Sequence, residues 1–277
     1  MITASIVTYI VSKDIDKENE LKTSIKCACS GIIEKVFIVD NSPTNFLKSI
    51  IEAQSDKIIY IFNNKNLGYG AGHNIAIRYA INIKSNYHVV LNPDILFEND
   101  TIIYLNKFMD NNQNVGQVLP KVLYPNGELQ YLCKLVPTPF DLIFKRFLPN
   151  KMTEKRMRKF QLQFTGYNKI MNIPYLSGCF MFFRISALKE IGLFDERFFM
   201  YPEDIDITRR MHEKYDTIFN PHITIIHAHA ADSYRSKKML WVHVINMIRY
   251  FNKWGWIFDE KRKVINKKVL KELNYKI

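Results

Sequence analysis

The stretch HVVLNPDILF, residues 88–97, runs from an apolar segment into a sharp polar break at Asn92-Pro93-Asp94, and a second apolar run follows. Short Val/Ile-rich runs of this kind are typical of strands that are buried on both faces of a parallel sheet. Ligands of such sheets bind beyond the carboxyl ends of the strands, so Asp94 is expected at a ligand-binding edge. Asn-Pro-Asp also terminates strands well, and this stretch alone leaves both interpretations open.

Three similar apolar runs precede this one, at residues 4–10 (ASIVTYI), 36–42 (VFIVDNS) and 57–62 (KIIYIF). Between the third and fourth runs, residues 71–84 place apolar side chains at 75, 76, 79, 80 and 83, which is helical spacing. This alternation predicts an α/β fold with a mostly parallel central sheet, right-handed crossovers and flanking helices.

The second half is less regular. Residues 137–172 are interpreted as basic and irregular, and residues 99–112 as a helix capped by Asn99 or Asp100. The other expected elements are a strand and turn within 115–131, a strand entering a helix at 174–188, a helix at 202–215, a strand at 217–229 and a helix at 237–256.

The composition favours one large domain, or one domain with an appendage: 277 residues, 47% of them hydrophobic. No run approaches the roughly 20 apolar residues of a membrane span. The N-terminal MITASIVTYIVSKD is expected to form a first strand and not a signal peptide. Four cysteines without metal-ligand spacing predict a reducing compartment and structural roles: Cys27, Cys29, Cys133 and Cys179.

The net charge of +12 is concentrated in two segments. Residues 145–159 hold seven Lys/Arg against one Glu, and residues 235–277 hold twelve against three acids, so the remainder is slightly acidic. Aromatic and aliphatic residues accompany this charge, among them Trp241, Ile245 and Phe251 near helical spacing. Such segments suit a peripheral contact with an anionic membrane, although core or dimer contacts explain the aromatics equally well. Nucleic acid is disfavoured, because no binding motif accompanies the charge.

The glycine-rich stretch NNKNLGYGAGHNIAI, residues 63–77, follows one expected strand and opens a helix. A phosphate could bind at such a helix start. The G-x-G-x-G spacing is neither the dinucleotide fingerprint nor a P-loop, so the motif is weak by itself.

In combination the motifs are more specific. VDNS, NNKNLGYGAGHNIAI, LNPDI, YLSGCFMFFR, FDERFFMYPEDIDITRR and IIHAHAADS occur in one order along the chain. This set, over roughly residues 1–250, resembles glycosyltransferase family two, with its rhamnosyltransferase-like branch the nearest match. The resemblance implies a GT-A fold, with a Rossmann-like mostly parallel sheet. It also implies a nucleotide-sugar donor, Mg²⁺ or Mn²⁺, and inversion at the anomeric carbon.

The resemblance also suggests a domain organisation. Residues 1–230 would form the GT-A domain, with 1–115 as its nucleotide-binding half and 116–230 as its acceptor-binding half. Residues 231–277 would form a basic, aromatic helical extension.

Residues at the strand ends and in the glycine stretch are the expected donor contacts. Asp40 matches the acid that meets the nucleotide base, with Thr8 and Tyr9 lining the same pocket. The full nucleotide-sugar-binding set is Thr8, Tyr9, Asp40, Asn41, Ser42, Asn66, Gly68, Asn74, Asn92 and Asp94.

Asp94 matches the last acid of the family's Asp-x-Asp metal motif, and Asn92 replaces the first acid. That replacement leaves one carboxylate, so the cation would be held weakly or mostly through the diphosphate. His227 matches a histidine that completes the metal site in some members, and His229 is a neighbouring candidate.

Asp204 matches the catalytic base. Glu203 precedes it in the first turn of an expected helix, where both acids would also complement the helix dipole. Inverting transfer is a single displacement and needs one carboxylate to take the proton of the acceptor hydroxyl. Ser177, Gly178 and Cys179 are expected to form a floor under the acceptor, while Arg209 would either reach a phosphate or be solvated.

These observations predict an inverting, metal-dependent hexosyltransferase. Its preferred donor would be dTDP-rhamnose and its acceptor a lipid-linked glycan of a bacterial surface polysaccharide such as an O-antigen or capsule. It would act in the cytoplasm at the inner face of the plasma membrane, and could be a homodimer. A UDP-hexose donor and a non-catalytic nucleotide-sugar-binding scaffold remain the alternatives.

Overall fold

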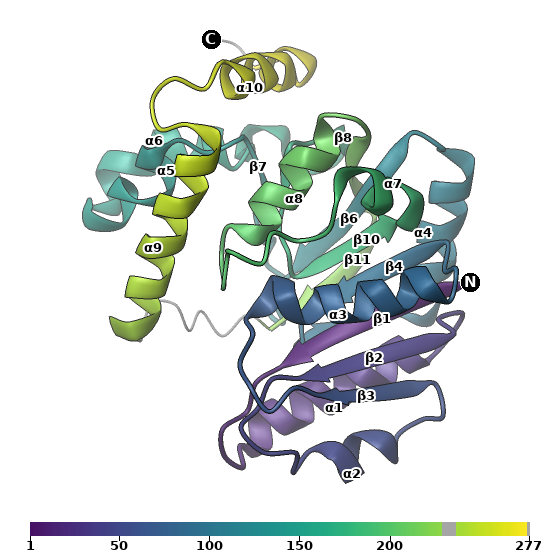
Figure 1. Cartoon of the computed structure of the whole chain (residues 1–277). Helices are drawn as coiled ribbons and strands as arrows, with labels where there is room; N and C mark the ends of the chain where they lie inside the picture. The colour runs from purple at the N-terminus through teal and green to yellow at the C-terminus, as the bar shows by residue number, and fades with distance from the viewer. Residues whose placement is uncertain (229–236, 276–277) are drawn as a thin grey trace.

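The computed structural model describes residues 1–228 and 237–275. Within these residues the centre is a nine-stranded mixed sheet in the order β3-β2-β1-β4-β10-β6-β11-β5, with β8 paired to β11 (Figure 1). A two-stranded sheet pairs β7 with β9. The strands are β1 (Ile2–Thr8), β2 (Lys35–Asp40), β3 (Ile58–Phe62), β4 (Tyr87–Leu91), β5 (Ile95–Leu96), β6 (Val115–Leu123), β7 (Cys133–Lys134), β8 (Met171–Asn172), β9 (Tyr175–Leu176), β10 (Phe180–Arg184) and β11 (Asp216–His227).

Helices cover both faces of the sheet: α3 lies in front of β1 and β2, and α1 lies behind them (Figure 1). The helices are α1 (Ile15–Cys29), α2 (Lys48–Glu52), α3 (Tyr69–Asn82), α4 (Asn99–Asn111), α5 (Pro139–Leu142), α6 (Asn150–Phe160), α7 (Ile185–Ile191), α8 (Glu203–His212), α9 (Lys237–Trp254) and α10 (Glu260–Glu272), with 3₁₀ turns at Phe144–Phe147 and Gln163–Thr165.

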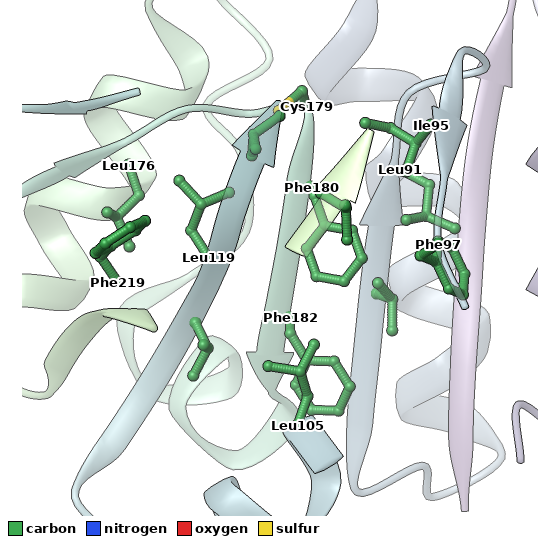
Figure 2. Close-up of a cluster of buried hydrophobic side chains, with 14 of the residues drawn as sticks. Leu91, Ile95, Phe97, Leu105, Leu119, Leu176, Cys179, Phe180, Phe182 and Phe219 are labelled. Atoms are coloured by element: carbon green, nitrogen blue, oxygen red, sulfur yellow. The ribbon is translucent and has the colours of Figure 1, made fainter. Parts of the chain in front are cut away.

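Side-chain alternation along the strands builds two cores. In β4, Val89 and Leu91 join the cluster that includes α1 and α4, whereas Val90 joins the cluster under α3, α7 and α8. Figure 2 shows part of the first cluster, in which Phe180 of β10 lies beside Leu91 and Phe182 lies beside Leu105. Because successive side chains of a strand point to opposite faces, fully apolar strands are needed here.

The sequence-based prediction of an α/β fold with a mostly parallel sheet is confirmed, and each expected strand is present within a few residues. Two local predictions are wrong. Residues 137–172 contain α6, which turns few apolar side chains inward and so gives little hydrophobic signal. Helix α4 is preceded by Glu98 as its N-cap, without a side-chain capping bond, and not by Asn99 or Asp100.

Strands from both predicted halves, 1–115 and 116–230, share the one sheet, since β10 lies between β4 and β6. The predicted extension, 231–277, forms α9 and α10 in its described part, and α10 crosses over the end of α8 (Figure 1). No helix among residues 1–228 and 237–275 has the length and apolar character that crossing a bilayer requires.

The extension is joined to α8 by a buried ion pair. The Arg209 guanidinium donates two 2.8 Å bonds to the Asp259 carboxylate and lies 4.0 Å from the Trp254 ring centroid. Arg209 therefore neither reaches a phosphate nor faces solvent, and both sequence-based alternatives for it are wrong.

Candidate active site

The polar residues at the strand ends meet at one rim of the sheet. Thr8 lies in register with Asp40 across the parallel pair β1–β2. Strand β10 runs antiparallel to β4 and pairs Phe180 with Leu91, so the segment before β10 also reaches this rim. The Asn92 backbone N–H donates to the Cys179 carbonyl at 2.9 Å, which joins the segment 177–179 to the end of β4.

The nucleotide end of the rim is fixed by Asp40. This carboxylate is fully buried. It accepts a 2.9 Å hydrogen bond from the Ser42 backbone N–H and a 2.5 Å hydrogen bond from the Tyr60 hydroxyl. Asn41 donates to the Gly68 carbonyl at 3.2 Å. In this conformation Asp40 shapes the loop, and its direct contact with a nucleotide base stays a prediction.

Beside Asp40, the residues expected to line the nucleotide pocket differ in their solvent exposure. Thr8 is buried, with its carbonyl accepting a 2.9 Å bond from the Asn41 backbone N–H, whereas Tyr9 is half exposed. The Ser42 hydroxyl accepts a 2.9 Å bond from the Ile10 backbone N–H. Tyr9 is therefore the side chain of this group that offers the most free surface to a ligand.

The glycine-rich stretch packs α3 tightly against the chain before α8. Gly68 has a φ of +85°, and a Cβ there would lie 2.2 Å from the Phe199 carbonyl oxygen. A Cβ on Gly70 would lie 2.9 Å from the Phe194 side chain. These glycines permit the close approach that brings the start of α3 beside the start of α8. Asn66 stabilises the turn by accepting a 3.0 Å bond from the Gly68 backbone N–H.

Asn74 makes structural contacts that the sequence did not indicate. Its amide nitrogen donates to the Phe194 carbonyl and to Glu196, each at 2.9 Å, and its amide oxygen accepts a 3.0 Å bond from the Phe194 backbone N–H. It is buried and its amide is occupied at both ends in this conformation, so its contact with the donor stays a prediction. It is a link between α3 and the loop after α7.

Asp94 and His227 meet at the rim. Asp94 Oδ1 lies 3.3 Å from His227 Nε2, and Asn92 Nδ2 lies 3.3 Å from the same nitrogen. Burial disfavours the imidazolium, but the Cys179 sulfur and the Asp94 carboxylate outweigh it and raise the pKa of His227 to about 10. The raised pKa favours a charged His227 beside Asp94. His229 lies outside the described residues.

Gln130, which sequence reasoning missed, orients His227. Its side-chain oxygen lies 3.0 Å from His227 Nδ1, and its side-chain nitrogen donates to the His227 carbonyl at 2.8 Å. A proton on Nδ1 is thereby held by Gln130, and Nε2 is directed towards Asp94. Gln130 is buried. It lies 97 residues from His227 in the chain, so no local pattern points to this pair.

Asp204 contacts the segment 177–179 at Gly178. Its carboxylate accepts a 3.0 Å bond from the Gly178 backbone N–H and a 2.7 Å bond from the Ile205 backbone N–H. A Cβ on Gly178 would come within 3.1 Å of the Asp204 Cβ, so the glycine permits this contact. Burial raises the pKa of Asp204, while Lys134 and these backbone bonds oppose the rise.

Glu203 is more deeply buried than Asp204. Its Oε2 atom has no hydrogen-bond partner among the described residues. Burial raises the pKa of Glu203, and the adjacent Asp204 carboxylate raises it further. The pair therefore holds its proton on Glu203 and its charge on Asp204.

Tyr69, also missed from the sequence, shows that the two acidic groups share one site. Its hydroxyl donates a 2.5 Å bond to the Gly178 carbonyl. Burial raises the pKa of Tyr69, and the negative charges of Glu203, Asp204 and Asp94 act on it in the same direction. Asp94 and Asp204 thus lie around one tyrosine and one three-residue segment.

The structural comparisons place this architecture among GT-A transferases. A crystal structure of S. aureus TarS superposes with a TM-score of 0.58 at 15% identity, covering 99% of this chain and 42% of that one. GalNAc-T7 with UDP, GalNAc and Mn²⁺ superposes with a TM-score of 0.57 at 14% identity, covering 81% and 43%. At these identities the likeness concerns the fold.

The fold and the rim thus define a glycosyltransferase of GT-A architecture. Residues 6–192, more than half of the chain, match the model of "Glycosyl transferase family 2", and the chain belongs to this family.

Three curated relatives of known name are similar to this chain in sequence. The low-salt glycan biosynthesis hexosyltransferase Agl10 of Haloferax volcanii is 27% identical over 207 residues, 73% of this chain and 60% of that protein. Rhamnosyltransferase WbbL of Escherichia coli K12 is 25% identical over 64% of this chain and 66% of that protein. The N-acetylglucosaminyl-diphospho-decaprenol L-rhamnosyltransferase of Mycobacterium tuberculosis is 23% identical over 72% and 67%. The chain therefore matches about two thirds of the length of these relatives.

Proposed function

We propose that this glycosyltransferase is an inverting, metal-assisted hexosyltransferase, with L-rhamnose from dTDP-rhamnose as the preferred donor. The acceptor is a lipid-linked glycan of a bacterial surface polysaccharide such as an O-antigen or capsule. One observation supports the proposal: the segment 177–179 bonds to Asp204 through the Gly178 N–H and to the strand end that carries Asp94 through the Cys179 carbonyl, with His227 3.3 Å from Asp94. The rhamnosyl preference and the lipid-linked acceptor are supported by the names of the E. coli and M. tuberculosis relatives.

The reaction needs one proton acceptor. Asp204, held by two backbone N–H groups, takes the proton of the acceptor hydroxyl while that oxygen forms a bond to the anomeric carbon. The bond from the anomeric carbon to the donor phosphate breaks on the opposite face, and its electrons leave with the nucleoside diphosphate. No enzyme nucleophile takes part, so Cys179 needs only to hold the acceptor floor.

The residues present fit a divalent cation. No group of three or more His, Cys, Asp or Glu able to hold a metal occurs within residues 1–228 and 237–275. Asp94 and His227 would therefore hold it together with diphosphate oxygens and water. Asp94 Oδ1 and His227 Nε2 lie 3.3 Å apart, so both could contact the same cation. A bound cation would stabilise the negative charge of the leaving diphosphate.

Replacing Gln130 with leucine should weaken Mn²⁺-dependent nucleotide binding about 10- to 100-fold, the usual cost of losing the partner of a metal-binding histidine. His227 would then be free to turn its ring away from Asp94. Isothermal titration of nucleotide with and without Mn²⁺ measures the effect. Gln54→Leu, an exposed site in the turn after α2, is the matched control. Unchanged Mn²⁺ dependence in Gln130→Leu would rule out this role.

A thermal-shift panel tests the function itself. Ligands that bind only the native state raise the unfolding midpoint. We expect dTDP-rhamnose with Mn²⁺ to give the largest rise, and a larger rise with a UDP-hexose would select the alternative donor. A donor that stabilises the protein without any transfer to lipid-linked acceptors would select the scaffold alternative. No rise with any nucleotide sugar would refute the proposal.

We also propose that α9 contacts an anionic membrane. The structure divides its aromatic and aliphatic side chains: Tyr250 and Phe251 are buried, whereas Trp241 is 68% exposed and Ile245 and Ile248 are about 40% exposed on one helical face. Packing in the core therefore explains the two buried aromatic residues but not the three exposed side chains. The excess of Lys and Arg in residues 235–277 supplies attraction to anionic headgroups.

Changing Trp241, Ile245 and Ile248 together to serine should reduce binding to anionic vesicles at least about tenfold, because a fully buried large apolar side chain contributes about 1.5–3 kcal/mol. Flotation with phosphatidylglycerol-containing and pure phosphatidylcholine vesicles measures it. The exposed pair Ile103 and Tyr104 on α4, also changed to serine, is the control. Equal flotation of both variants would contradict the proposed surface.

A further inference from the structure

Lys134 is a cation of the acceptor half that the proposed chemistry leaves without a role. It lies in β7, paired with Tyr175 of β9, and β9 leads directly into Ser177, Gly178 and Cys179. The Ser177 backbone N–H donates to the Leu132 carbonyl at 3.2 Å, which holds the two segments together. Lys134 is therefore carried by the same small sheet that carries the acceptor floor.

Within the part of the chain that the structure describes, the Lys134 ammonium has no carboxylate partner. Its nitrogen lies 4.7 Å from the Tyr175 ring centroid and 3.4 Å from the Tyr175 hydroxyl. No carboxylate of the described residues comes within the 4.0 Å of an ion pair. Burial lowers the pKa of Lys134, and Asp204 opposes this from beyond ion-pair distance. A partly buried charge without a counter-ion is costly, so this cation retains capacity to bind an anion.

The side of the site on which Lys134 lies identifies that anion. In a single displacement the leaving diphosphate and the base are on opposite faces of the transferred sugar. The donor diphosphate is proposed to bind at Asp94 and His227, whereas Asp204 is the first carboxylate whose charge acts on Lys134 and on Tyr175. An anion beside Lys134 would therefore belong to the acceptor.

We propose that Lys134 and the Tyr175 hydroxyl form a subsite for a phosphate group of the acceptor, within about one sugar ring of the attacking hydroxyl. This inference rests on the proposed function and names its acceptor class, a sugar joined directly to phosphate. The reaction that supplies such an acceptor must be a sugar-phosphate transfer. The phosphate could belong to a lipid anchor or to a soluble phosphosugar, since the chemistry recognised is the same.

The test is a binding measurement with the donor site filled. The protein is saturated with Mn²⁺ and dTDP, and decyl diphosphate is titrated in, with inorganic pyrophosphate and decanol as separate arms. We expect decyl diphosphate to bind and decanol not to bind. In Lys134→Met the affinity should fall about 10- to 100-fold, as for a charge-assisted hydrogen bond, and in Lys134→Arg it should largely recover. Lys107→Met, on the exposed face of α4, is the control.

Each outcome decides one point. Equal binding of decyl diphosphate and pyrophosphate supports the subsite and a soluble phosphate source, whereas preference for the decyl compound supports a lipid anchor. Equal binding by wild-type protein and Lys134→Met, with unchanged unfolding midpoints, overturns the subsite. A wild-type protein that binds dTDP with Mn²⁺ but no diphosphate probe overturns it too and leaves the proposed function standing. Failure to bind dTDP at all refutes the proposed function instead.

Discussion

Replacing Asp204 with asparagine should lower the turnover of sugar transfer by about 10²- to 10⁴-fold, the usual contribution of a general base. Asparagine keeps the size of the side chain but cannot take a proton. Nucleotide affinity should persist, because the proposed donor contacts lie around Asp94, His227 and the ends of β1 and β2. Single-turnover transfer, together with titration of nucleotide into the variant, measures both quantities.

The pH dependence sharpens this prediction. Burial raises the pKa of Asp204, and only the ionised carboxylate accepts a proton. Transfer by the wild-type protein should therefore decline as the pH falls through this raised pKa, and the residual activity of the variant should lack this limb. Asp100→Asn, an exposed carboxylate in the first turn of α4, should behave as wild type. Retention of more than about a tenth of the turnover in Asp204→Asn would exclude Asp204 as the base.

Removing the Asp259 carboxylate should produce the largest loss of stability. In Asp259→Ala the Arg209 guanidinium would remain buried with no counter-ion, and breaking a buried pair in this way costs about 3–5 kcal/mol. The pair is 1% and 3% exposed, so water cannot replace the lost carboxylate. Asp259 also accepts a 2.9 Å bond from the Arg262 backbone N–H at the start of α10, so the helix cap is lost as well.

Chemical denaturation of the whole chain measures the effect as a change in the free energy of unfolding. The neighbouring Glu260→Ala is the matched control, because its exposed side chain pairs only with Lys263 across one helical turn. We expect the control to remain within about 0.5 kcal/mol of wild type. A loss below about 1 kcal/mol in Asp259→Ala would show that the extension does not depend on this pair.

Local patterns in the sequence predicted the sheet well and the long-range links poorly. Strands β1, β2 and β4 are buried on both faces and β3 is half-buried, so their sequences are mostly apolar and easily recognised. Helix α6 turns mainly charged residues to its surface, and its apolar spacing is too sparse to distinguish it from a loop.

In the candidate site too, residues in local motifs were predicted and residues held by long-range contacts were missed. Asp94 and Asp204 stand in recognisable motifs at a strand end and a helix start, and the structure brings them around Tyr69. Gln130 and Lys134 lie in or before a two-residue strand whose partner is about 40 residues away, so no periodic pattern precedes them. Asn74 lay inside the glycine motif, and only its contacts with Phe194 and Glu196, about 120 residues further on, revealed its role.

A crystal structure with Mn²⁺, dTDP and a non-transferable rhamnosyl donor analogue would test the central arrangement most directly. The account predicts an anomalous manganese peak between Asp94 Oδ1 and His227 Nε2, diphosphate oxygens on that peak, and the anomeric carbon turned towards Asp204. A diphosphate bound away from the rim of β1 and β4, or an Asp204 carboxylate on the same face of the sugar as the diphosphate, would contradict it.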